Sequence, residues 1–351
     1  MMFAQNGRGA ILAISLLVGC VLPRVPLNAQ LPHPSTIAFL SNRDNAQRGF
    51  DIFLIAPDGQ KPVNVTKQFN SAGVTGASMP RLLAKRSAVL FFSVSTKSFK
   101  EIDLTNSTIR SVLTTEHETP EFDISPDQRF ILYRDRVDTT FQLFEADLMS
   151  GARRNLTRNK HNNTEPTYSP DGSTISFVCD SDGSRSIAIM NRDGSAQRIL
   201  TNNFGDDRFP RFSPDGQRIV FTSSRSATIP DEYHVYGIDV TGKNFSLLYD
   251  GRMFNTQPQF LKDGTSVVFV SANRSKKLSH VLLKNLQTGT VNDITKDLVL
   301  LSQNVVLSAD GRYLAFEHVT IADSEILCYD LASGTLRNLT NSKSWDCSPS
   351  F

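Results

Sequence analysis

The sequence predicts an all-β protein that folds as a single β-propeller, and three observations support this prediction. A Ser-Pro-Asp motif begins at Ser125, Ser169 and Ser213, 44 residues apart, and degenerate copies follow at Leu261 and Ser308. A strand with apolar residues at alternate positions follows each copy, and the apolar spacing of a helix is absent. A period in the mid-forties fits four short strands joined by three tight turns, which is one propeller blade.

The residues of the recurring motif are those that a tight turn between two strands requires. In Ser213-Pro214-Asp215-Gly216 the serine can accept a backbone hydrogen bond, the proline fixes φ, and the aspartate favours the next turn position. The glycine then adopts the left-handed conformation that closes a bulged hairpin. Gln128 stands where other copies have glycine, so we expect either a positive φ there, at a cost of about 1 kcal/mol, or a different turn type.

Counting the second strand of each repeat predicts seven four-stranded blades. These strands begin near Ile37, Val89, Ile131, Ile175, Ile219, Val267 and Leu314. Apolar residues on both of their faces indicate strands packed between neighbouring blades. The repeat around residues 83–124 has lost the turn signature, and a propeller of six blades is the alternative if this stretch is an insertion.

The two ends of the chain are predicted to meet in one blade. The repeat at Ile37 lacks the preceding Pro-x-aromatic strand that other repeats have, as in Pro210-Arg211-Phe212. Residues 347–351 align with residues 208–212 and therefore supply the missing innermost strand of the first blade. Such pairing removes the open sheet edge that a ring of blades would otherwise expose.

A third strand, a second tight turn and a fourth strand complete each repeat. The fourth strand ends on an apolar residue followed by threonine: Val65-Thr66, Leu113-Thr114, Leu156-Thr157, Leu200-Thr201, Ile294-Thr295 and Leu339-Thr340. The polar loop that follows leads to the first strand of the next blade.

Residues 169–201, SPDGSTISFVCDSDGSRSIAIMNRDGSAQRILT, resemble the TolB-type propeller repeat, and the resemblance extends over residues 34–351. The same repeat occurs in the periplasmic TolB protein, in propeller domains of prolyl-oligopeptidase-like peptidases and in some sugar-processing lyases. The resemblance implies a fold and leaves function open, because the motif residues form turns and core. Seven blades and the lack of a recognisable additional N-terminal domain depart from TolB itself, so a role in the Tol system is not implied.

The first residues are predicted to direct export. Arg8 supplies a positive charge, and Ala10 to Leu22 form an apolar stretch too short to span a bilayer. Leu27-Asn28-Ala29 resembles a signal-peptidase site, which predicts a signal peptide over residues 1–29, a periplasmic or secreted protein, and no transmembrane span in the mature chain. The alternative is the lipobox Leu17-Val18-Gly19-Cys20, in which a lipidated Cys20 anchors the protein to the envelope.

Composition narrows the classes of partner and chemistry. The net charge is +2, and acidic and basic residues are interspersed, which argues against a nucleic-acid surface. The sequence holds no Gly-x-Ser-x-Gly elbow, no His-Glu-x-x-His and no paired Cys-x-x-Cys, so we predict no catalytic residue, metal or cofactor. We also expect a monomer. After the leader, Cys179, Cys328 and Cys347 are expected to be small buried side chains, with a Cys328–Cys347 bridge as the alternative.

The loops that join one blade to the next are predicted to meet around the central channel, where a concave ring of polar groups can bind a ligand. The candidate binding residues are His117, Glu118, His161, Asn163, Glu165, Asp206, Asp207, Arg208, Gln257 and Asp346. The alternative is that these loops face solvent and satisfy one another. Trp345, the only tryptophan, is expected to be a buried wedge beside the closing strand.

These features lead to the hypothesis of an exported, non-catalytic propeller that binds a protein or peptide partner of the cell envelope at the channel mouth. Interlocked blades would hold the loops in a fixed ring, so that binding costs little ordering entropy. The alternative is a metal-assisted carbohydrate-active enzyme, a lyase or hydrolase, that uses His117, His161 and nearby carboxylates. A third interpretation is a structural envelope protein without a ligand.

Overall fold

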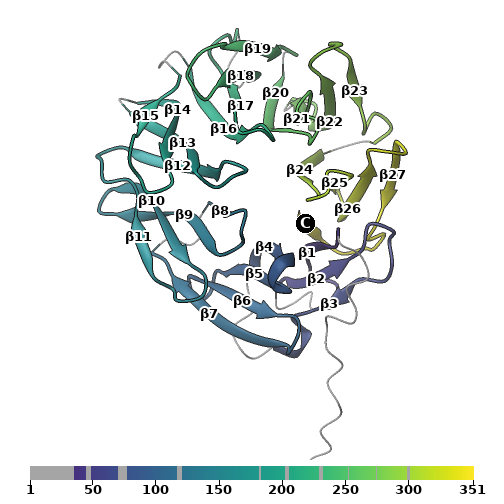
Figure 1. The fold of residues 1–351 in the computed structure, drawn as a ribbon. Coiled ribbons are helices and arrows are strands. Elements are labelled where there is room, and N and C mark those ends of the chain that lie inside the picture. The colour runs from purple at the N-terminus through teal and green to yellow at the C-terminus, as the bar shows by residue number, and fades with distance from the viewer. Residues whose placement is uncertain are drawn as a thin grey trace, which may run out of the picture.

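The computed structural model describes residues 35–351, apart from residues 45–48, 70–76, 117–120, 182, 202–204, 229–231, 252, 274 and 299–300. The described strands form seven four-stranded antiparallel sheets, arranged as blades in a ring (Figure 1). The predicted seven-bladed all-β propeller is therefore confirmed, and the six-bladed alternative is wrong. The predicted leader with Cys20, and the candidate residues His117 and Glu118, lie outside the described residues.

Each blade has four strands, which follow one another from the axis outward. Blade 1 contains β28 (Asp346–Ser350), β1 (Ile37–Ser41), β2 (Asp51–Ile55) and β3 (Val63–Asn64). Blade 2 contains β4 (Ala77–Leu83), β5 (Ala88–Ser93), β6 (Ser98–Asp103) and β7 (Thr108–Thr114). Blade 3 contains β8 (Phe122–Ile124), β9 (Phe130–Val137), β10 (Thr140–Asp147) and β11 (Arg153–Asn155). Blade 4 contains β12 (Asn162–Tyr168), β13 (Thr174–Ser181), β14 (Ser184–Asn191) and β15 (Arg198–Ile199).

The remaining three blades have the same order. Blade 5 contains β16 (Asp207–Phe212), β17 (Arg218–Ser223), β18 (His234–Asp239) and β19 (Ser246–Tyr249). Blade 6 contains β20 (Phe254–Phe260), β21 (Ser266–Asn273), β22 (Leu278–Asn285) and β23 (Val291–Asp293). Blade 7 contains β24 (Leu301–Leu307), β25 (Tyr313–Val319), β26 (Ser324–Asp330) and β27 (Thr335–Asn338). Two short 3₁₀ helices, η2 (Lys67–Phe69) and η3 (Ala84–Arg86), lie in blades 1 and 2, and no helix of the described residues is long and apolar enough to cross a membrane.

Blade 1 is closed by the two ends of the chain, as predicted. The C-terminal strand β28 pairs antiparallel with β1, with Ser41 opposite Asp346 and Ala38 opposite Ser350. Because neighbouring sheets of a propeller are not hydrogen-bonded into one continuous sheet, this pairing is what ties the end of the chain back to its first blade.

The apolar core lies between neighbouring blades. Phe92 and Phe99 of blade 2 pack against Ile131 and Tyr133 of blade 3, and all four side chains are fully buried. The rings of Phe99 and Tyr133 meet edge to face, with their centroids 5.9 Å apart. Each blade thus buries its second and third strands only because another blade covers them.

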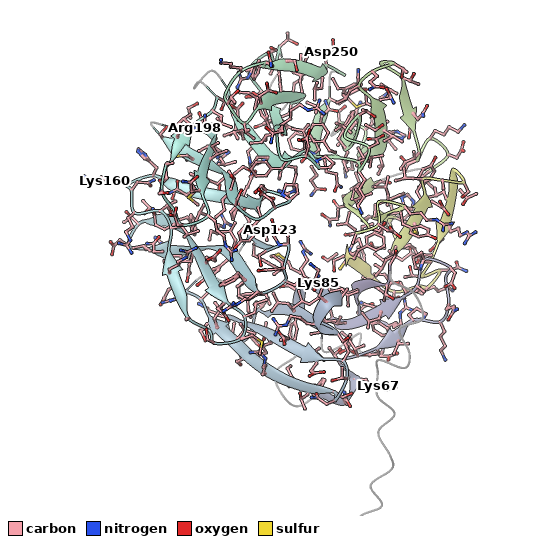
Figure 2. All side chains as sticks on the ribbon, in the orientation of Figure 1. Lys67, Lys85, Asp123, Lys160, Arg198 and Asp250 are labelled. Atoms are coloured by element: carbon pink, nitrogen blue, oxygen red, sulfur yellow. The ribbon has the colours of Figure 1, made fainter. Side chains whose placement is uncertain are left out.

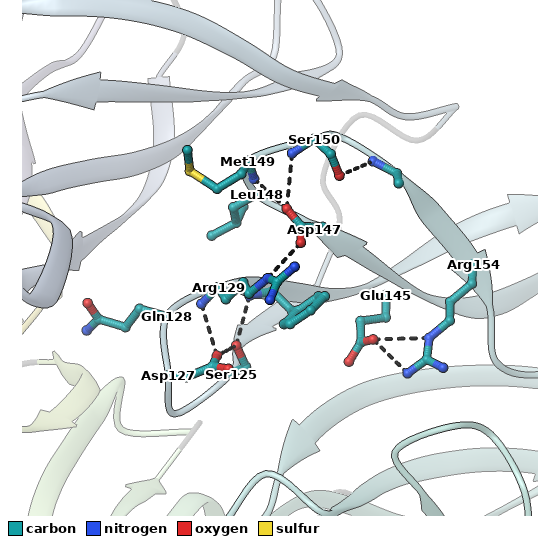
Figure 3. Close-up of polar contacts among 12 residues, drawn as sticks. Ser125, Asp127, Gln128, Arg129, Glu145, Asp147, Leu148, Met149, Ser150 and Arg154 are labelled. Atoms are coloured by element: carbon teal, nitrogen blue, oxygen red, sulfur yellow. Dashed lines mark hydrogen bonds and ion pairs between the residues drawn. The ribbon is translucent and has the colours of Figure 1, made fainter.

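The inner hairpin turns have the predicted chemistry, which the turn of blade 3 illustrates (Figure 3). The Ser125 hydroxyl accepts a hydrogen bond from the backbone N–H of Phe130 at 2.9 Å and donates to the Asp127 carboxylate. Gln128 has a φ of 59°, which confirms the positive φ expected where glycine is missing. In blade 2 the turn signature is lost, and the 3₁₀ helix η3 replaces the turn, followed by Ser87 at a φ of 48°.

The two faces of the ring carry different connections. In each antiparallel blade the first-to-second and third-to-fourth strand turns lie on one side, which we call the turn face. The second-to-third hairpins and the loops between blades lie on the other, which we call the loop face. Neighbouring inner turns touch, since a Cβ on Gly172 would lie 3.3 Å from Pro126, and this contact confirms that these turns share one face.

Candidate functional site

The innermost strands of all seven blades surround a central cavity of about 470 Å³. Its wall contains residues of, or directly beside, β4, β8, β12, β16, β20, β24 and β28. The lining residues are Met79, Arg81, Glu121, Phe122, Glu165, Pro166, Phe209, Arg211, Gln257, Pro258, Gln259, Asn304, Val305, Val306, Leu307, Ser348, Pro349, Ser350 and Phe351. A cavity of this size is within the range of small-ligand sites.

A β-bulge in the inner strands gives the wall its shape. Six residues of the wall have a φ between 49° and 56°, and the register of each inner strand shifts at or beside that residue: Met79, Glu165, Phe209, Gln257, Asn304 and Ser348. Five of them precede proline, and Asn304 precedes Val305. A bulge bends a strand and re-aims its side chains. The Pro-x-aromatic pattern therefore marks the site as well as the strand.

The bulge residues connect one blade to the next by hydrogen bonds. The Glu121 carboxylate accepts from the Glu165 backbone N–H at 2.7 Å, and the Glu165 carboxylate accepts from the Phe209 N–H at 2.5 Å. Further round the ring, the side-chain carbonyl oxygen of Gln257 accepts from the Asn304 backbone N–H at 3.2 Å. These bonds fix the spacing of the inner strands and so the width of the cavity.

Glu165 and Arg208, two of the predicted site residues, form an ion pair at this ring. The Arg208 Nε donates to the Glu165 carboxylate at 2.6 Å. Burial raises the pKa of Glu165 above its ordinary value, and the positive Arg208 acts in the opposite direction. Glu165 and Gln257 line the cavity, and Arg208 lies directly beside it. The Glu165 carboxylate is already engaged in the ion pair with Arg208, although it faces the cavity.

Two arginines occupy the next inward-facing position, two residues after the bulge. Arg81 of β4 and Arg211 of β16 line the cavity, and each donates from Nη1 to the carbonyl oxygen of its own preceding proline, at 3.1 Å and 2.9 Å. The Arg81 guanidinium also lies over the Phe122 ring, 5.2 Å from its centroid. Among the described residues, the two guanidinium groups make no further hydrogen bond or ring contact.

Asn163, Asp207 and Asp346 are placed differently from the prediction. All three are fully buried at the start of an inner strand, which leaves no side-chain surface for a ligand in the channel. Asp207 pairs with Arg225 at 2.8 Å, and Asp346 pairs with Arg43 at 2.7 Å. Because each arginine follows the second strand of the same blade, these carboxylates fasten the loops of the loop face to the blade beneath.

The last two predicted residues, Asp206 and His161, lie on the loop face. Asp206 pairs with Arg185 at 3.1 Å and accepts a hydrogen bond from the Tyr233 hydroxyl at 2.5 Å. Burial and this bond raise the pKa of Tyr233 to about 12. The backbone carbonyl of His161 accepts from Asn163 Nδ2 at 3.0 Å, so the predicted group of polar residues is partly a structural network.

An exposed apolar rim lies on the loop face of blade 7, and the sequence did not predict it. Trp345 is 43% exposed, so the expectation of a buried wedge is wrong. Trp345 forms an isolated β-bridge with Ser324, at the end of the hairpin loop between β25 and β26. Ile321 lies at the tip of this loop and is 93% exposed. Leu301, 36% exposed, pairs with Val319 at the start of that hairpin. Trp345 directly precedes β28 and Leu301 begins β24, and both of these strands line the cavity further along. We call Leu301, Ile321 and Trp345 the apolar rim.

Metal and thiol chemistry have little support in the part of the chain that the structure describes. It contains no group of three or more His, Cys, Asp or Glu side chains that could hold a metal ion. Cys179, Cys328 and Cys347 are free thiols, so the alternative of a Cys328–Cys347 bridge is wrong. Burial raises the pKa of Cys328 and of Cys347 to about 12, which disfavours the nucleophilic thiolate form of both.

Sequence reasoning missed Arg81 and Arg211, although the signal was present. The residue between proline and the aromatic ring lines the cavity in Pro210-Arg211-Phe212 and in Pro258-Gln259-Phe260, whereas Thr167 of Pro166-Thr167-Tyr168 is buried outside it. In Figure 2, Asp123, which holds the same place in β8, lies at the inner edge of the ring, whereas Lys160 and Arg198 lie at its circumference. This single position supplies Arg81, Arg211, Gln259, Val306 and Ser350 to the wall.

Comparisons with known proteins agree with this fold. Residues 103–230 match the model of the TolB beta propeller domain family, which confirms the TolB-type repeat predicted from the sequence. A search of curated proteins gave no match.

Solved structures with the same fold differ in activity. TolB from Acinetobacter baumannii is 18% identical, with a TM-score of 0.57, over 94% of this chain and 88% of that chain. An oligogalacturonate lyase in complex with manganese is 15% identical, with a TM-score of 0.68, over 86% of this chain and 87% of that one. A puromycin-hydrolyzing peptidase of Mycobacterium tuberculosis is 13% identical, with a TM-score of 0.64, over 83% of this chain and 50% of that one. At such identities the likeness concerns the fold alone.

Proposed function

We propose, from the TolB-type repeat of residues 103–230 and the ring of seven blades that contains it, that this chain is a non-catalytic binding protein whose central cavity receives a peptide segment of a partner protein. The observation that carries the proposal is the cavity itself. All seven inner strands contribute to it, and its wall combines proline and phenylalanine surface with carboxamide and guanidinium groups. A mixed wall of this kind suits an extended peptide, which presents both apolar side chains and backbone amides.

The rigidity of the site supports binding. The bulge residues are held by bonds from one blade to the next, and the buried pairs of Asp207 and Asp346 fasten the loops above them. A preformed site loses little conformational entropy when it binds. The apolar rim of Leu301, Ile321 and Trp345 adds exposed apolar surface beside the opening, which is typical of a protein-binding face.

The proposal is tested by selecting a displayed library of random peptides on the purified protein. Two variants fill the cavity, Gln259→Trp and Val306→Trp, and Asn292→Trp on the outer strand β23 is the matched control. We expect peptides that bind the wild type and Asn292→Trp, with at least tenfold weaker binding to either filled variant at unchanged melting temperature.

Two results would contradict the proposal. Selected peptides that bind the filled variants as well as the wild type would place binding elsewhere. Manganese-dependent turnover of oligouronides, lost in the filled variants, would show that the cavity serves carbohydrate chemistry, as in the alternative derived from the sequence.

The proposed place of action is the cell envelope, supported by the leader-like residues 1–29. Cys20→Ala separates the two export routes in a bacterial host. If signal peptidase cleaves after Ala29, the variant is processed and fractionates like the wild type. If Cys20 is lipidated, the wild type sediments with membranes and the variant does not.

A further inference from the structure

We infer that the central cavity recognises a carboxylate of its peptide ligand, held between the guanidinium groups of Arg81 and Arg211. This inference rests on the proposed function and specifies its ligand as an acidic peptide. The two residues belong to β4 and β16, which are far apart in the sequence and meet only across the central cavity.

The two arginines have hydrogen-bonding capacity that the described residues do not use. A guanidinium group has five N–H donors in a planar fork. Each of these arginines uses one nitrogen on the carbonyl of its own preceding proline, and the carboxylates beside them pair with other arginines in the described part of the chain. Most of both forks is therefore left for a group that enters the cavity.

The charges of the residues that line the cavity are unbalanced. The two acidic residues that line the cavity already have partners, because Glu121 lies 3.4 Å from Arg134 and Glu165 lies 2.5 Å from Arg208. The positive charges of Arg81 and Arg211 are the ones left over on the described wall. These charges favour a ligand with an anionic group.

Asp123 is the acidic group that attracts the Arg81 guanidinium, although no ion pair joins the two and its own hydrogen bonds come from neutral donors. Its Oδ2 accepts from the Thr167 hydroxyl at 3.1 Å and from the Tyr168 backbone N–H at 2.9 Å. Burial lowers the pKa of Arg81 from its ordinary value, Asp123 acts in the opposite direction, and the positive Arg211 lowers it further. The two guanidinium groups thus repel each other weakly across the cavity, and an anion between them would relieve that repulsion.

Of the two forks, that of Arg81 is the better shielded, because Arg211 is exposed. Arg81 is half-buried and lies against the Phe122 ring, so its fork is held in one plane before a ligand arrives. Planar forks match the two oxygens of a carboxylate, and a charge-assisted bond is stronger where water is partly excluded. The carboxamides of Gln257, Gln259 and Asn304 also line the cavity and can bond the amide groups that flank such a carboxylate.

The experiment compares two kinds of peptide on matched protein variants. The first peptide is a selected binder with its acidic residues intact. The second has the same sequence with each Asp changed to Asn, each Glu changed to Gln, and an amidated C-terminus. The proteins are the wild type, Arg81→Gln/Arg211→Gln, and the control Lys243→Gln/Arg337→Gln, which removes the same charge from exposed outer positions. Galacturonate oligomers and inorganic phosphate are titrated on the same proteins.

Acidic residues should be enriched among peptides selected on the wild type and on the control. The cavity double variant should bind the acidic peptide about tenfold or more weakly, because it loses a charge-assisted bond, and should bind the neutral peptide as the wild type does. Arg81→Lys/Arg211→Lys should recover only part of the loss, since lysine keeps the charge without the fork.

The outcomes separate this inference from the proposed function. If no peptide binds in the cavity at all, the proposed function fails. If peptides bind in the cavity with no acidic preference, or with a preference that the double variant keeps, the carboxylate inference fails and the proposed function stands. Tighter binding of galacturonate oligomers or phosphate than of any acidic peptide would also overturn it.

Discussion

One threonine hydroxyl completes the backbone pairing in five of the seven blades. The fourth strands are short, and the threonine that follows each accepts the hydrogen bond of a buried N–H on the third strand. The pairs are Ile52 to Thr66, Leu143 to Thr157, Ile187 to Thr201, Val281 to Thr295 and Ile326 to Thr340, at 2.9 to 3.0 Å. The recurring apolar-threonine pair thus replaces a ladder hydrogen bond that strand length alone would leave unmade.

Thr157→Val should destabilise the protein by about 1–2 kcal/mol, because it leaves the buried Leu143 N–H without an acceptor at almost constant side-chain volume. Thr157→Ser keeps the hydroxyl and should cost less. The measurement is the midpoint of urea unfolding of the three proteins. Equal midpoints for the valine and serine variants would show that volume, and not the hydrogen bond, matters at this position.

At the scale of the single hairpin, an aspartate organises the turn. In the outer turn of blade 3, Asp147 accepts hydrogen bonds from the backbone N–H groups of Met149 and Ser150 and pairs with Arg129 at 2.8 Å (Figure 3). The bond from Ser150 and the pairing with Arg129 lower the pKa of Asp147 to about 2. The aspartates of the inner turns, such as Asp171 and Asp215, likewise have lowered pKa values because of their serine and backbone donors.

These turns should make the propeller sensitive to acid. A carboxyl whose pKa is lower in the folded than in the unfolded state stabilises fully above the unfolded pKa, and that stability is lost as the pH falls through the folded pKa. The contribution of Asp147 should therefore disappear between about pH 4 and pH 2. Asp147→Asn should cost about 1 kcal/mol at pH 7, after allowance for the exposed Arg129, and almost nothing at pH 2.

The test is the free energy of urea unfolding from pH 7 to pH 2, with Asp250→Asn at an exposed position as the control. The difference between the wild type and Asp147→Asn should shrink as the pH falls, while the control follows the wild type throughout. A difference that grows toward low pH would contradict the sign of the effect.

At the scale of the whole molecule, the seam in blade 1 is the one place where a blade is assembled from both ends of the described chain. Asp346 and Arg43 cross this seam, and the Arg43 guanidinium also lies over the Phe39 and Phe53 rings. In blade 5 the buried pair of Asp207 and Arg225 joins the corresponding positions, with both partners in one continuous segment. Blades 1 and 5 thus contain equivalent buried ion pairs, of which only the pair in blade 1 crosses the seam.

Asp346→Ala and Asp207→Ala should each cost about 3 kcal/mol, because each leaves a largely buried arginine without its partner. Only Asp346→Ala should let β28 detach before global unfolding. Hydrogen exchange of the backbone amides of Asp346, Cys347, Ser348 and Ser350 measures this directly. Equal acceleration of these amides in both variants would mean that the seam opens only when the whole ring unfolds.

The fold could be predicted from the sequence because the signals involved are local. Ser125, Ser169 and Ser213 begin turns whose donors and acceptors lie within five residues, and the closing strand is marked by its proline and final aromatic residue. The site was predicted less completely. The burial of Asp346 depends on Arg43, 303 residues away, and no local pattern distinguishes it from Glu165, which faces the cavity. The inward direction of Arg81 follows from a bulge two residues earlier, which is evident only when the repeats are aligned on their prolines.

The pairing of Ala38 with Ser350 has a practical consequence for orientation. Both ends of the described chain leave the ring on the turn face, where Ser35 donates a hydrogen bond to Asp310 of the neighbouring inner turn at 2.9 Å. A linker attached before Ser35 or after Phe351 therefore starts on the side opposite Trp345 and Ile321. Immobilisation through either terminus on a sensor surface, or a lipid anchor in an envelope, would direct the apolar rim and the interblade loops away from the support, toward whatever approaches from solution.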